Sequence, residues 1–202
     1  MTLFKNEILS SESFLPSVYG IGYIGVGNYR TTVNRKKTKE YSKWNNILHR
    51  GYDKKYKERN PTYKDCYVAD TWHNFQNFAK WFEENYVEGW ELDKDILING
   101  NKIYSPETCC FVPREINALF KSPKEGVTSL PSGVSYDKFN KKYKVSVRVY
   151  GKIKTEGRYN TIEEAFQAYR TVKEKHIKEV ANKWRGQITE EVYQTMTNYK
   201  IT

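Results

Sequence analysis

Apolar side chains recur with a helical period in two stretches of the first half of the chain. In residues 39–51, Trp44, Ile47 and Leu48 fall at helical spacing, which predicts a short amphipathic helix with a basic outer face. In residues 71–89, apolar side chains recur every three or four positions, which predicts a helix that ends near Gly89. The members of this second stripe are Phe75, Phe78, Ala79, Phe82 and Tyr86. We interpret the stripe as core.

Shorter elements flank these two helices. Residues 18–29 interleave aromatic and β-branched residues with glycine, which predicts a strand pair interrupted by glycine. Residues 90–98 alternate like a strand, and residues 110–112 predict a second short strand. Residues 113–120 begin with a proline, which suits the first turn of a helix. The order strand, loop, strand, helix predicts a ββα unit.

The last part of the chain shows a strand period and then a long helical one. In residues 142–150, apolar side chains alternate with basic and polar ones, so one face packs and the other is cationic. Residues 161–184 predict a long helix that opens with a capping box formed by Thr161 and Glu164. Together the two patterns predict a three-stranded antiparallel sheet packed on one long helix.

These patterns place the chain in the α+β class and divide it into segments. Proline, glycine and serine are concentrated before residue 132, which predicts a linker between two domains. The first residues are expected to be a flexible lead-in. The predicted division is 1–14 lead-in, 15–121 ββα module, 122–130 linker, 131–186 second domain and 187–202 C-terminal extension.

Charge is distributed unevenly along the chain. There are 34 lysines and arginines against 24 acidic residues, which gives a formal charge of +10 and a pI of about 9.3. Residues 1–60 carry +7 and residues 131–186 carry +8, whereas residues 61–121 carry −4. Basic blocks of this kind are either ordinary solvated surface or a surface for a polyanion. An acidic segment between cationic ones also suits a metal-dependent nuclease, in which carboxylates hold a cation and basic residues hold phosphates.

Composition excludes several classes of protein. Aromatic residues make up 15% of the chain, so extensive disorder is not expected. Because there is neither a long apolar run nor a signal-peptide pattern, we expect a cytoplasmic protein with no membrane partner. Cys66, Cys109 and Cys110 lack metal-ligand spacing, which predicts buried thiols and no zinc site. The positive net charge argues against mimicry of DNA.

The second domain carries a family resemblance. The segments Gly133–Tyr136 (GVSY), Lys142–Val145 (KYKV), Gly157–Thr161 (GRYNT) and Glu163–Tyr169 (EEAFQAY) resemble, in the same order, the Apetala-type (ethylene-response-factor) DNA-binding domain. The resemblance covers residues 133–184 and implies a three-stranded sheet that lies in the major groove of double-stranded DNA. By position, the residues that would face DNA are Ser135, Lys138, Lys142, Lys144, Arg148 and Arg158. The alternative is a small α+β domain whose basic strand face is merely solvated.

A second set of motifs lies in the middle of the chain: Trp44 with Leu48–Arg50, Trp72-x-x-Phe75-x-x-Phe78, Leu92–Ile96, Gly100–Cys109 and Val112–Asn117. Over residues 40–120 these motifs resemble the HNH homing-type endonucleases of phages. The resemblance implies a ββα nuclease in which a histidine activates water and Mg²⁺ or a similar divalent cation stabilises the leaving oxygen. By position, Asp93 and Asn117 would be metal ligands.

Lys94 stands where this family has its general-base histidine, and Thr108 where it has a loop asparagine. The ordinary pKa of a lysine lies far above neutral pH, and acidic neighbours stabilise its charged form. His73 is the candidate to supply the base from a neighbouring element, with a surface or capping histidine as the alternative. For Asp93 and its neighbour Asp95 the alternative is a salt-bridged strand pair.

Three functions are compatible with these features. The first is a DNA-binding protein of phage or mobile-element type that acts as a metal-dependent HNH-like endonuclease, with Lys94 or His73 as catalytic residue. The second is a non-catalytic DNA-binding regulator or counter-defence protein on a degenerate HNH scaffold. The third, a protein-binding module that blocks an enzyme, rests only on the aromatic content. If the chain is phage-encoded, the expected location is the host cytoplasm.

Overall fold

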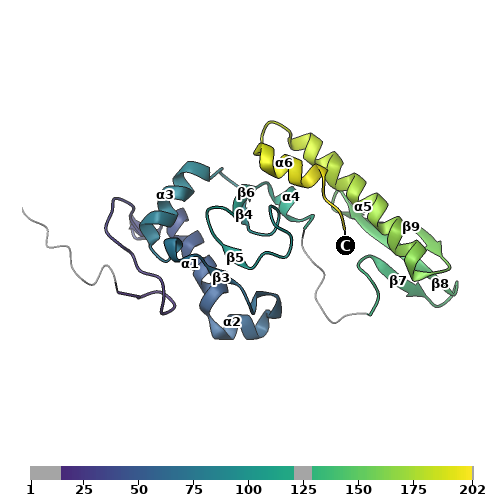
Figure 1. Cartoon of the computed structure of the whole chain (residues 1–202), viewed down its shortest axis with the longest axis horizontal. Helices are drawn as coiled ribbons and strands as arrows, with labels where there is room; N and C mark the ends of the chain where they lie inside the picture. Colours follow the sequence, from purple (N-terminus) through teal and green to yellow (C-terminus); the bar gives the residue numbers. More distant parts are fainter. Residues whose placement is uncertain (1–14, 121–128, 202) are drawn as a thin grey trace, which may run out of the picture. The chain divides into compact units, whose positions relative to one another are not determined.

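The computed structural model describes residues 15–120 and 129–201 (Figure 1). The chain divides into two compact units, Met1–Pro113 and Arg114–Thr202. Helices and strands both occur, so the predicted α+β class is confirmed. The predicted lead-in over 1–14 lies outside the described residues, as does most of the predicted linker over 122–130. Among the helices of the described ranges, none combines the length and apolar character that a membrane crossing requires.

A side-chain hydrogen bond caps the N-terminus of each α-helix described in the first unit. The Thr38 Oγ1 accepts a hydrogen bond from the backbone N–H of Tyr41, and the Asn74 side chain accepts one from Gln76. Such caps satisfy donors that have no partner within the helix. The helices are α1 (Lys39–Tyr52), α2 (Lys54–Arg59) and α3 (Phe75–Asn85), with short 3-10 turns at Pro61–Tyr63 and Asp70–Trp72. The two helices predicted from apolar periods, α1 and α3, are confirmed.

Aromatic rings build much of the core of the first unit. Trp44 of α1, Trp72, and Phe75 and Phe78 of α3 are each 1% exposed or less. The Trp44 Nε1 donates to the Trp72 carbonyl at 2.6 Å, so the polar atom of this ring is satisfied in the interior. α1 packs against α3. The apolar stripes of both helices are therefore core, as predicted.

Strands of two or three residues complete the first unit. The pairs are β1 (Thr32–Val33) with β2 (Lys36–Lys37), antiparallel; β3 (Tyr67–Val68) with β5 (Ile103–Tyr104), parallel; and β4 (Glu91–Asp93) with β6 (Cys110–Val112), antiparallel. The strand predicted over 90–98 is therefore formed only near its start. Asp93 Oδ1 accepts hydrogen bonds from the backbone N–H groups of Asp95 and Ile96 at 2.7 and 2.9 Å, which turns the chain out of the strand.

The strand pair predicted over residues 18–29 is not formed. This segment is a loop with isolated bridges only, from Val18 to Gly22 and from Tyr23 to Asn74. Gly22 allows this loop to pack closely on α1. A Cβ on Gly22 would lie 2.4 Å from Leu48 Cδ1 and 3.0 Å from the Trp44 ring, so no side chain fits there without displacement.

The buried side chain of Gln76, on α3, holds this loop in place. Its Nε2 donates to the carbonyl oxygens of Ile24 and Tyr29 at 3.3 and 3.1 Å, and its Oε1 accepts from the Tyr29 N–H at 3.0 Å. The amide therefore satisfies three backbone groups that strand pairing would otherwise satisfy. The side chain of Gln76 thus makes hydrogen bonds to the loop that a neighbouring strand would otherwise make.

The second unit contains the predicted three-stranded antiparallel sheet with one long helix packed on it (Figure 1). Its elements are β7 (Val134–Asp137), β8 (Lys142–Val149), β9 (Lys152–Tyr159) and α5 (Ile162–Trp184), and the strand order is β7-β8-β9. The capping box predicted between Thr161 and Glu164 is present. Val145 and Val147 of β8 are buried in one cluster with Ala165 of α5. The alternation predicted along β8 is therefore confirmed.

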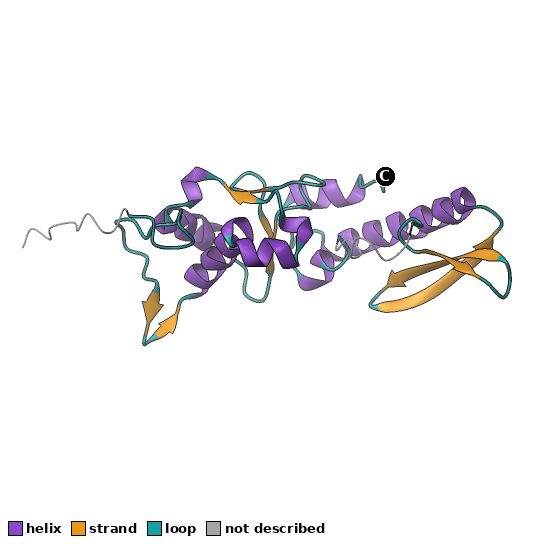
Figure 2. Ribbon diagram, turned by 90° about the horizontal axis from the view of Figure 1, so that it is seen from below, coloured by secondary structure: helices purple, strands orange, loops and turns teal. Residues whose placement is uncertain are grey.

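In its described residues the second unit has two further helices, α4 (Arg114–Asn117) and α6 (Glu190–Thr197), which are labelled in Figure 1. Figure 2 distinguishes the helices of the chain from its strands by colour. The helix predicted over 113–120 is thus a single turn, grouped with the second unit. Glu115 Oε2 accepts hydrogen bonds from Lys183 Nζ at 2.6 Å and from Trp184 Nε1 at 2.8 Å, which ties α4 to the end of α5. α6 packs on α5 within the C-terminal extension, for which no helix was predicted.

Candidate nucleic-acid interface

A row of polar side chains crosses all three strands of the β7-β8-β9 sheet. Ser135 of β7 lies opposite Lys144 of β8, which lies opposite Arg158 of β9. Residues directly opposite one another in antiparallel strands share a face, so these side chains project together. The neighbours of Lys144 along β8, Tyr143 and Val145, belong to the core packed on α5. The row therefore lies on the opposite face, which we term the outer face: Ser135, Lys142, Lys144, Ser146, Arg148 and Arg158.

The other residues predicted to face DNA lie toward the two ends of β8. Lys142 is exposed at the start of the strand, opposite Asp137. Arg148 lies beyond a β-bulge, and its Nη1 donates to the Gly151 carbonyl at 3.0 Å, which holds it beside the β8–β9 turn. Lys138 is exposed in the turn between β7 and β8. The sheet thus places all six predicted residues on one strand face and the turn that borders it.

Asp137 organises one end of the outer face. Its Oδ2 accepts a hydrogen bond from Arg158 Nε at 2.8 Å, and its Oδ1 accepts from the backbone N–H groups of Phe139 and Asn140, both at 3.1 Å. The bond from Arg158, followed by those from Asn140, holds the pKa of this carboxyl well below its usual range. Because Arg158 is bound through Nε, its two terminal nitrogens stay outside this pair.

Exposed lysines that sequence reasoning missed lie on β9 and in the β7–β8 turn. Lys152 and Lys154 lie opposite Val149 and Val147, so strand alternation assigns them to the packed face. Both are nevertheless exposed, because β9 is an edge strand of the sheet. Lys141, in the turn, is exposed as well. The density of lysines in this part of the sequence was the signal that could have found them.

A buried histidine supports the turn at the other end of the outer face. His176 of α5 is 4% exposed, and its Nε2 accepts a hydrogen bond from the backbone N–H of Tyr150 at 3.3 Å. The Tyr150 ring meets the imidazole edge-on, and its Oη donates to Glu179 at 3.3 Å. Burial, with a smaller effect of Lys173, lowers the pKa of His176. The fold therefore favours the neutral ring that accepts this bond.

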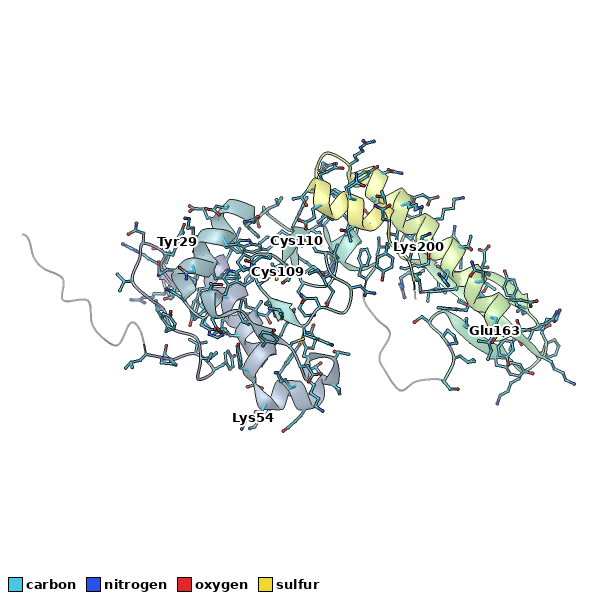
Figure 3. The ribbon with its side chains drawn as sticks, viewed as in Figure 1. Tyr29, Lys54, Cys109, Cys110, Glu163 and Lys200 are labelled. Atoms are coloured by element: carbon cyan, nitrogen blue, oxygen red, sulfur yellow. The ribbon has the colours of Figure 1, made fainter. Side chains whose placement is uncertain are left out.

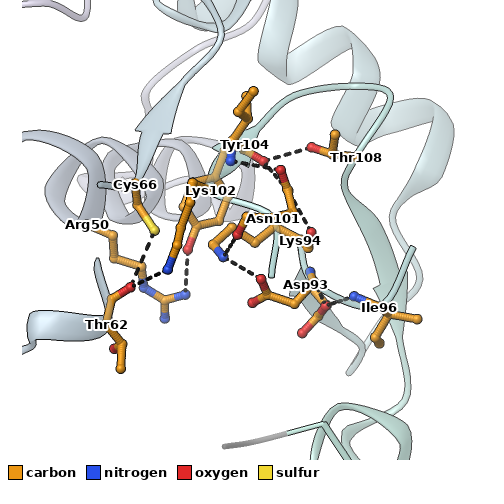
Figure 4. A network of polar contacts seen from close by, with 12 residues as sticks. Arg50, Thr62, Cys66, Asp93, Lys94, Ile96, Asn101, Lys102, Tyr104 and Thr108 are labelled. Atoms are coloured by element: carbon orange, nitrogen blue, oxygen red, sulfur yellow. Dashed lines mark hydrogen bonds and ion pairs between the residues drawn. The ribbon is translucent and has the colours of Figure 1, made fainter. Parts of the chain in front are cut away.

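Asp93 and Lys94, two of the residues predicted as a nuclease site, lie in a polar network of the first unit (Figure 4). Lys94 is 6% exposed, and its Nζ donates to Asp95 Oδ1 and to the Asn101 carbonyl, both at 2.6 Å. Asn101 Nδ2 donates back to the Lys94 carbonyl at 2.7 Å. The Nζ also lies 5.7 Å from the centre of the Tyr104 ring, a cation–π contact. Lys94 is thus a buried cation whose donors are directed at neighbouring residues.

Asp93, predicted as a metal ligand, uses its Oδ1 to form the turn that ends β4. Burial raises the pKa of its carboxyl, and the two backbone bonds partly offset this effect. A divalent cation needs several oxygen ligands around one position, whereas the next residue here is the buried ammonium of Lys94. Asn117, the second predicted ligand, lies in the other unit, at the end of α4. The residues around Asp93 in the first unit therefore do not fit a Mg²⁺ site.

His73, predicted as a substitute base, belongs to a separate group of contacts. Its Nε2 lies 2.8 Å from Tyr52 Oη and 3.0 Å from the Val68 carbonyl, and Tyr52 Oη also donates to that carbonyl at 3.0 Å. Its Nδ1 lies 3.7 Å from Asp70. These contacts connect α1, β3 and the turn before α3. They give His73 a structural role in the first unit.

The three cysteines, Cys66, Cys109 and Cys110, are buried and free, as predicted; the latter two are labelled within the first unit in Figure 3. Burial raises the pKa of the Cys109 thiol to about 12, and it also raises the pKa of Cys66. Thiols of this kind stay protonated at neutral pH and pack as small apolar groups. Within residues 15–120 and 129–201, histidine, cysteine and acidic side chains form no group of three or more that could hold a metal ion.

No protein-family model, curated protein or solved structure matches this chain. Function is therefore inferred from the chemistry of the two groups of residues described above. The outer face with its bordering turn combines Lys138, Lys142, Lys144, Arg148 and Arg158 on a rigid sheet. The network around Lys94, in contrast, is internally satisfied.

Proposed function

We propose that this chain binds double-stranded DNA through the outer face of the β7-β8-β9 sheet. The observation that carries the proposal is the row of Ser135, Lys144 and Arg158, which aligns a hydroxyl, an ammonium and a guanidinium across three strands. A three-stranded antiparallel sheet backed by one helix is also the architecture implied by the resemblance to the Apetala-type domain. The net charge of the chain, +10, favours a polyanionic partner.

The dimensions of the sheet suit the major groove. Neighbouring strands lie about 4.8 Å apart, so three strands span about 10 Å between the axes of the outer two. The major groove of B-DNA is about 12 Å wide and admits secondary-structure elements of this size. Lysines bind phosphate oxygens, so we assign Lys142 and Lys144 to the DNA backbone. Arg158, whose orientation Asp137 fixes, is the residue we assign to a guanine edge.

Salt dependence of binding tests this proposal. Affinity for a mixed-sequence duplex would be measured by fluorescence anisotropy over a series of salt concentrations. The double variant Lys142→Ala/Lys144→Ala should bind more weakly and lower the slope of log affinity against log salt by about two, because each neutralised phosphate contributes about one unit. The matched control, Lys175→Ala/Lys178→Ala, removes two exposed lysines of α5. Equal slopes in both variants would contradict docking through the outer face.

Metal-dependent DNA cleavage by an HNH-like module is a second proposal. It is supported by the antiparallel pair of β4 and β6, with Asp93 in the first strand. The hydrogen bonds of Lys94 and the turn formed by Asp93 account for both residues without catalysis. We therefore favour a non-catalytic DNA-binding protein, a regulator or counter-defence protein on a degenerate HNH scaffold.

A cleavage assay separates the two proposals. Supercoiled plasmid would be incubated with the protein in Mg²⁺, Mn²⁺ or EDTA, with a gel shift run on the same samples. A shift without nicking is the result expected of a binding protein. Nicking that requires the metal ion and disappears in Asp93→Ala, but not in the exposed control Asp65→Ala, would establish cleavage instead.

A further inference from the structure

Phe139 is an exposed aromatic ring in the turn between β7 and β8. Its 93% exposure is the highest among the large apolar residues of the described ranges, and the next value is 65%, for Ile153. Phenylalanine buries much of its surface in most folded domains, as Phe75 and Phe78 do here. A ring this exposed contributes little to the core, so its place in the turn calls for another explanation.

Hydrogen bonds fix the turn that presents Phe139. Asp137 Oδ1 accepts from the N–H groups of Phe139 and Asn140, and Asn140 Nδ2 donates to Asp137 Oδ2 at 2.9 Å. Lys141 closes the turn with a φ of 52°, a left-handed conformation that glycine or asparagine adopts at lower cost. The turn thus has a lysine at a position where glycine or asparagine would cost the backbone less. The backbone that carries the ring is therefore fixed before any partner binds.

Basic residues flank Phe139 in the sequence. Lys138 precedes it, Lys141 and Lys142 follow it, and all three are exposed. Arg158 is bound to the same Asp137 that fixes the turn. If the lysines of this turn bind phosphates, the turn brings Phe139 close to the nucleic acid, where base planes are the apolar surfaces within reach.

We propose that Phe139 stacks on a base at a position where the duplex is unpaired or partly unstacked. The inference rests on the proposed binding of DNA by the outer face. Aromatic side chains stack on bases of single strands, and apolar side chains enter base steps of distorted duplexes. A fully stacked duplex hides its base planes, whereas an unpaired nucleotide exposes one. The chain should therefore prefer a duplex that contains an unpaired base.

The test compares two short labelled duplexes that differ only in one unpaired base. Wild-type protein should bind the duplex with the unpaired base roughly 10-fold more tightly, in line with the usual effect of one base–aromatic stack. Phe139→Ala should lose this preference and Phe139→Tyr should keep it. The salt slope should stay the same in both variants, since neither changes a charge. Val87→Ala, at an exposed apolar position of the first unit, is the matched control.

The outcomes distinguish this inference from the proposed function. If wild-type protein binds neither duplex, DNA binding itself is wrong and the inference falls with it. If it binds both duplexes equally, or if Phe139→Ala keeps the preference, the base contact is wrong while DNA binding stands. Phosphatidylserine vesicles provide the third arm. Vesicle binding that Phe139→Ala removes, with DNA affinity unchanged, would assign the ring to a membrane surface and overturn the inference.

Discussion

Asp137 and Arg158 form an ion pair that spans the central strand of the sheet. Asp137 belongs to β7 and Arg158 to β9, and the Oδ2 and Nε atoms lie 2.8 Å apart although β8 runs between the two strands. The outer strands are thus joined by side chains as well as through the backbone of β8. The same carboxylate holds the turn that carries Phe139. One side chain therefore holds both the candidate base-reading arginine and the turn that carries the exposed ring.

Replacing Asp137 by alanine should lower the melting temperature of the protein. Arg158 would lose its partner, and two N–H groups of the turn would lose their acceptor. Because the pKa of this carboxyl is held low, its contribution is present above the ordinary carboxyl pKa and is lost as the pH falls into the acid range. Thermal melts followed by circular dichroism check this. The control Asp65→Ala, at an exposed site, should have the melting temperature of the wild type. An unchanged melting temperature in Asp137→Ala would contradict the expectation.

His176 should make stability depend on pH near neutrality. Tyr150, Glu179 and Lys173 surround it, and burial lowers its pKa below that of an unfolded histidine, so protonation favours the unfolded chain. Its contribution is complete above about pH 6.5, the ordinary pKa, and is lost as the pH falls below that value.

The variant His176→Gln keeps an acceptor without a titrating ring. Urea unfolding at pH 7.5 and 5.5 should therefore show a smaller pH effect in this variant than in wild type. The control His49→Gln changes a histidine of α1 that is not buried. An identical pH effect in wild type and His176→Gln would show that another group titrates.

Lys94→Met should destabilise the first unit. The substitution keeps the length of the side chain but leaves Asp95 and the Asn101 carbonyl without their donor. The expected loss in free energy of unfolding is about 1–3 kcal/mol. Urea denaturation measures it, with Lys102→Met, an exposed lysine, expected to change it by less than about 0.5 kcal/mol. Unchanged stability in Lys94→Met would reopen a catalytic role for this lysine.

Glu115→Ala should loosen the contact of α4 with the end of α5. The substitution removes the acceptor of Lys183 Nζ and Trp184 Nε1. Since the pair is partly exposed, the expected loss of stability is only about 1 kcal/mol. The emission maximum of Trp184, one of five tryptophans, should shift while the fold is retained. The exposed control Glu156→Ala should leave stability and the emission maximum as in wild type. An unshifted emission maximum in Glu115→Ala would contradict the contact between Glu115 and Trp184.

The spacing of apolar side chains predicted those helices and strands in which the spacing repeats over several helical turns or strand residues. These elements are the apolar stripes of α1 and α3, the alternation of β8 and the capping box of α5. Each depends on residues close together in the sequence, so it can be predicted without knowing the tertiary packing. The strand over 90–98 was predicted too long because its alternation hides the side-chain turn at Asp93. β3 and β5 were missed because two-residue strands paired over a long sequence separation leave no local signal.

The candidate sites differ in how far sequence could predict them. Strand alternation was enough to place Lys144 and Arg148 on one face of the sheet. Arg158 was predicted from the family resemblance, and the strand register places it opposite Lys144. Motif spacing could not reveal that Lys94 is buried and paired, because burial depends on packing from distant segments. The role of Asp137 was also hidden, since an aspartate before a turn has the same sequence signature whether or not an arginine meets it.

The side chain of Gln76 imposes a strict chemical requirement on one position of α3. It donates twice and accepts once, the pattern of a carboxamide, to the backbone of Ile24 and Tyr29. Glutamate has the same shape but can only accept when ionised, so it would face two carbonyl oxygens with a negative charge. Methionine has the same length and satisfies none of the three groups. The path of the loop before α1 is therefore encoded in part by a side chain about 50 positions further along the sequence, together with the loop's own glycines.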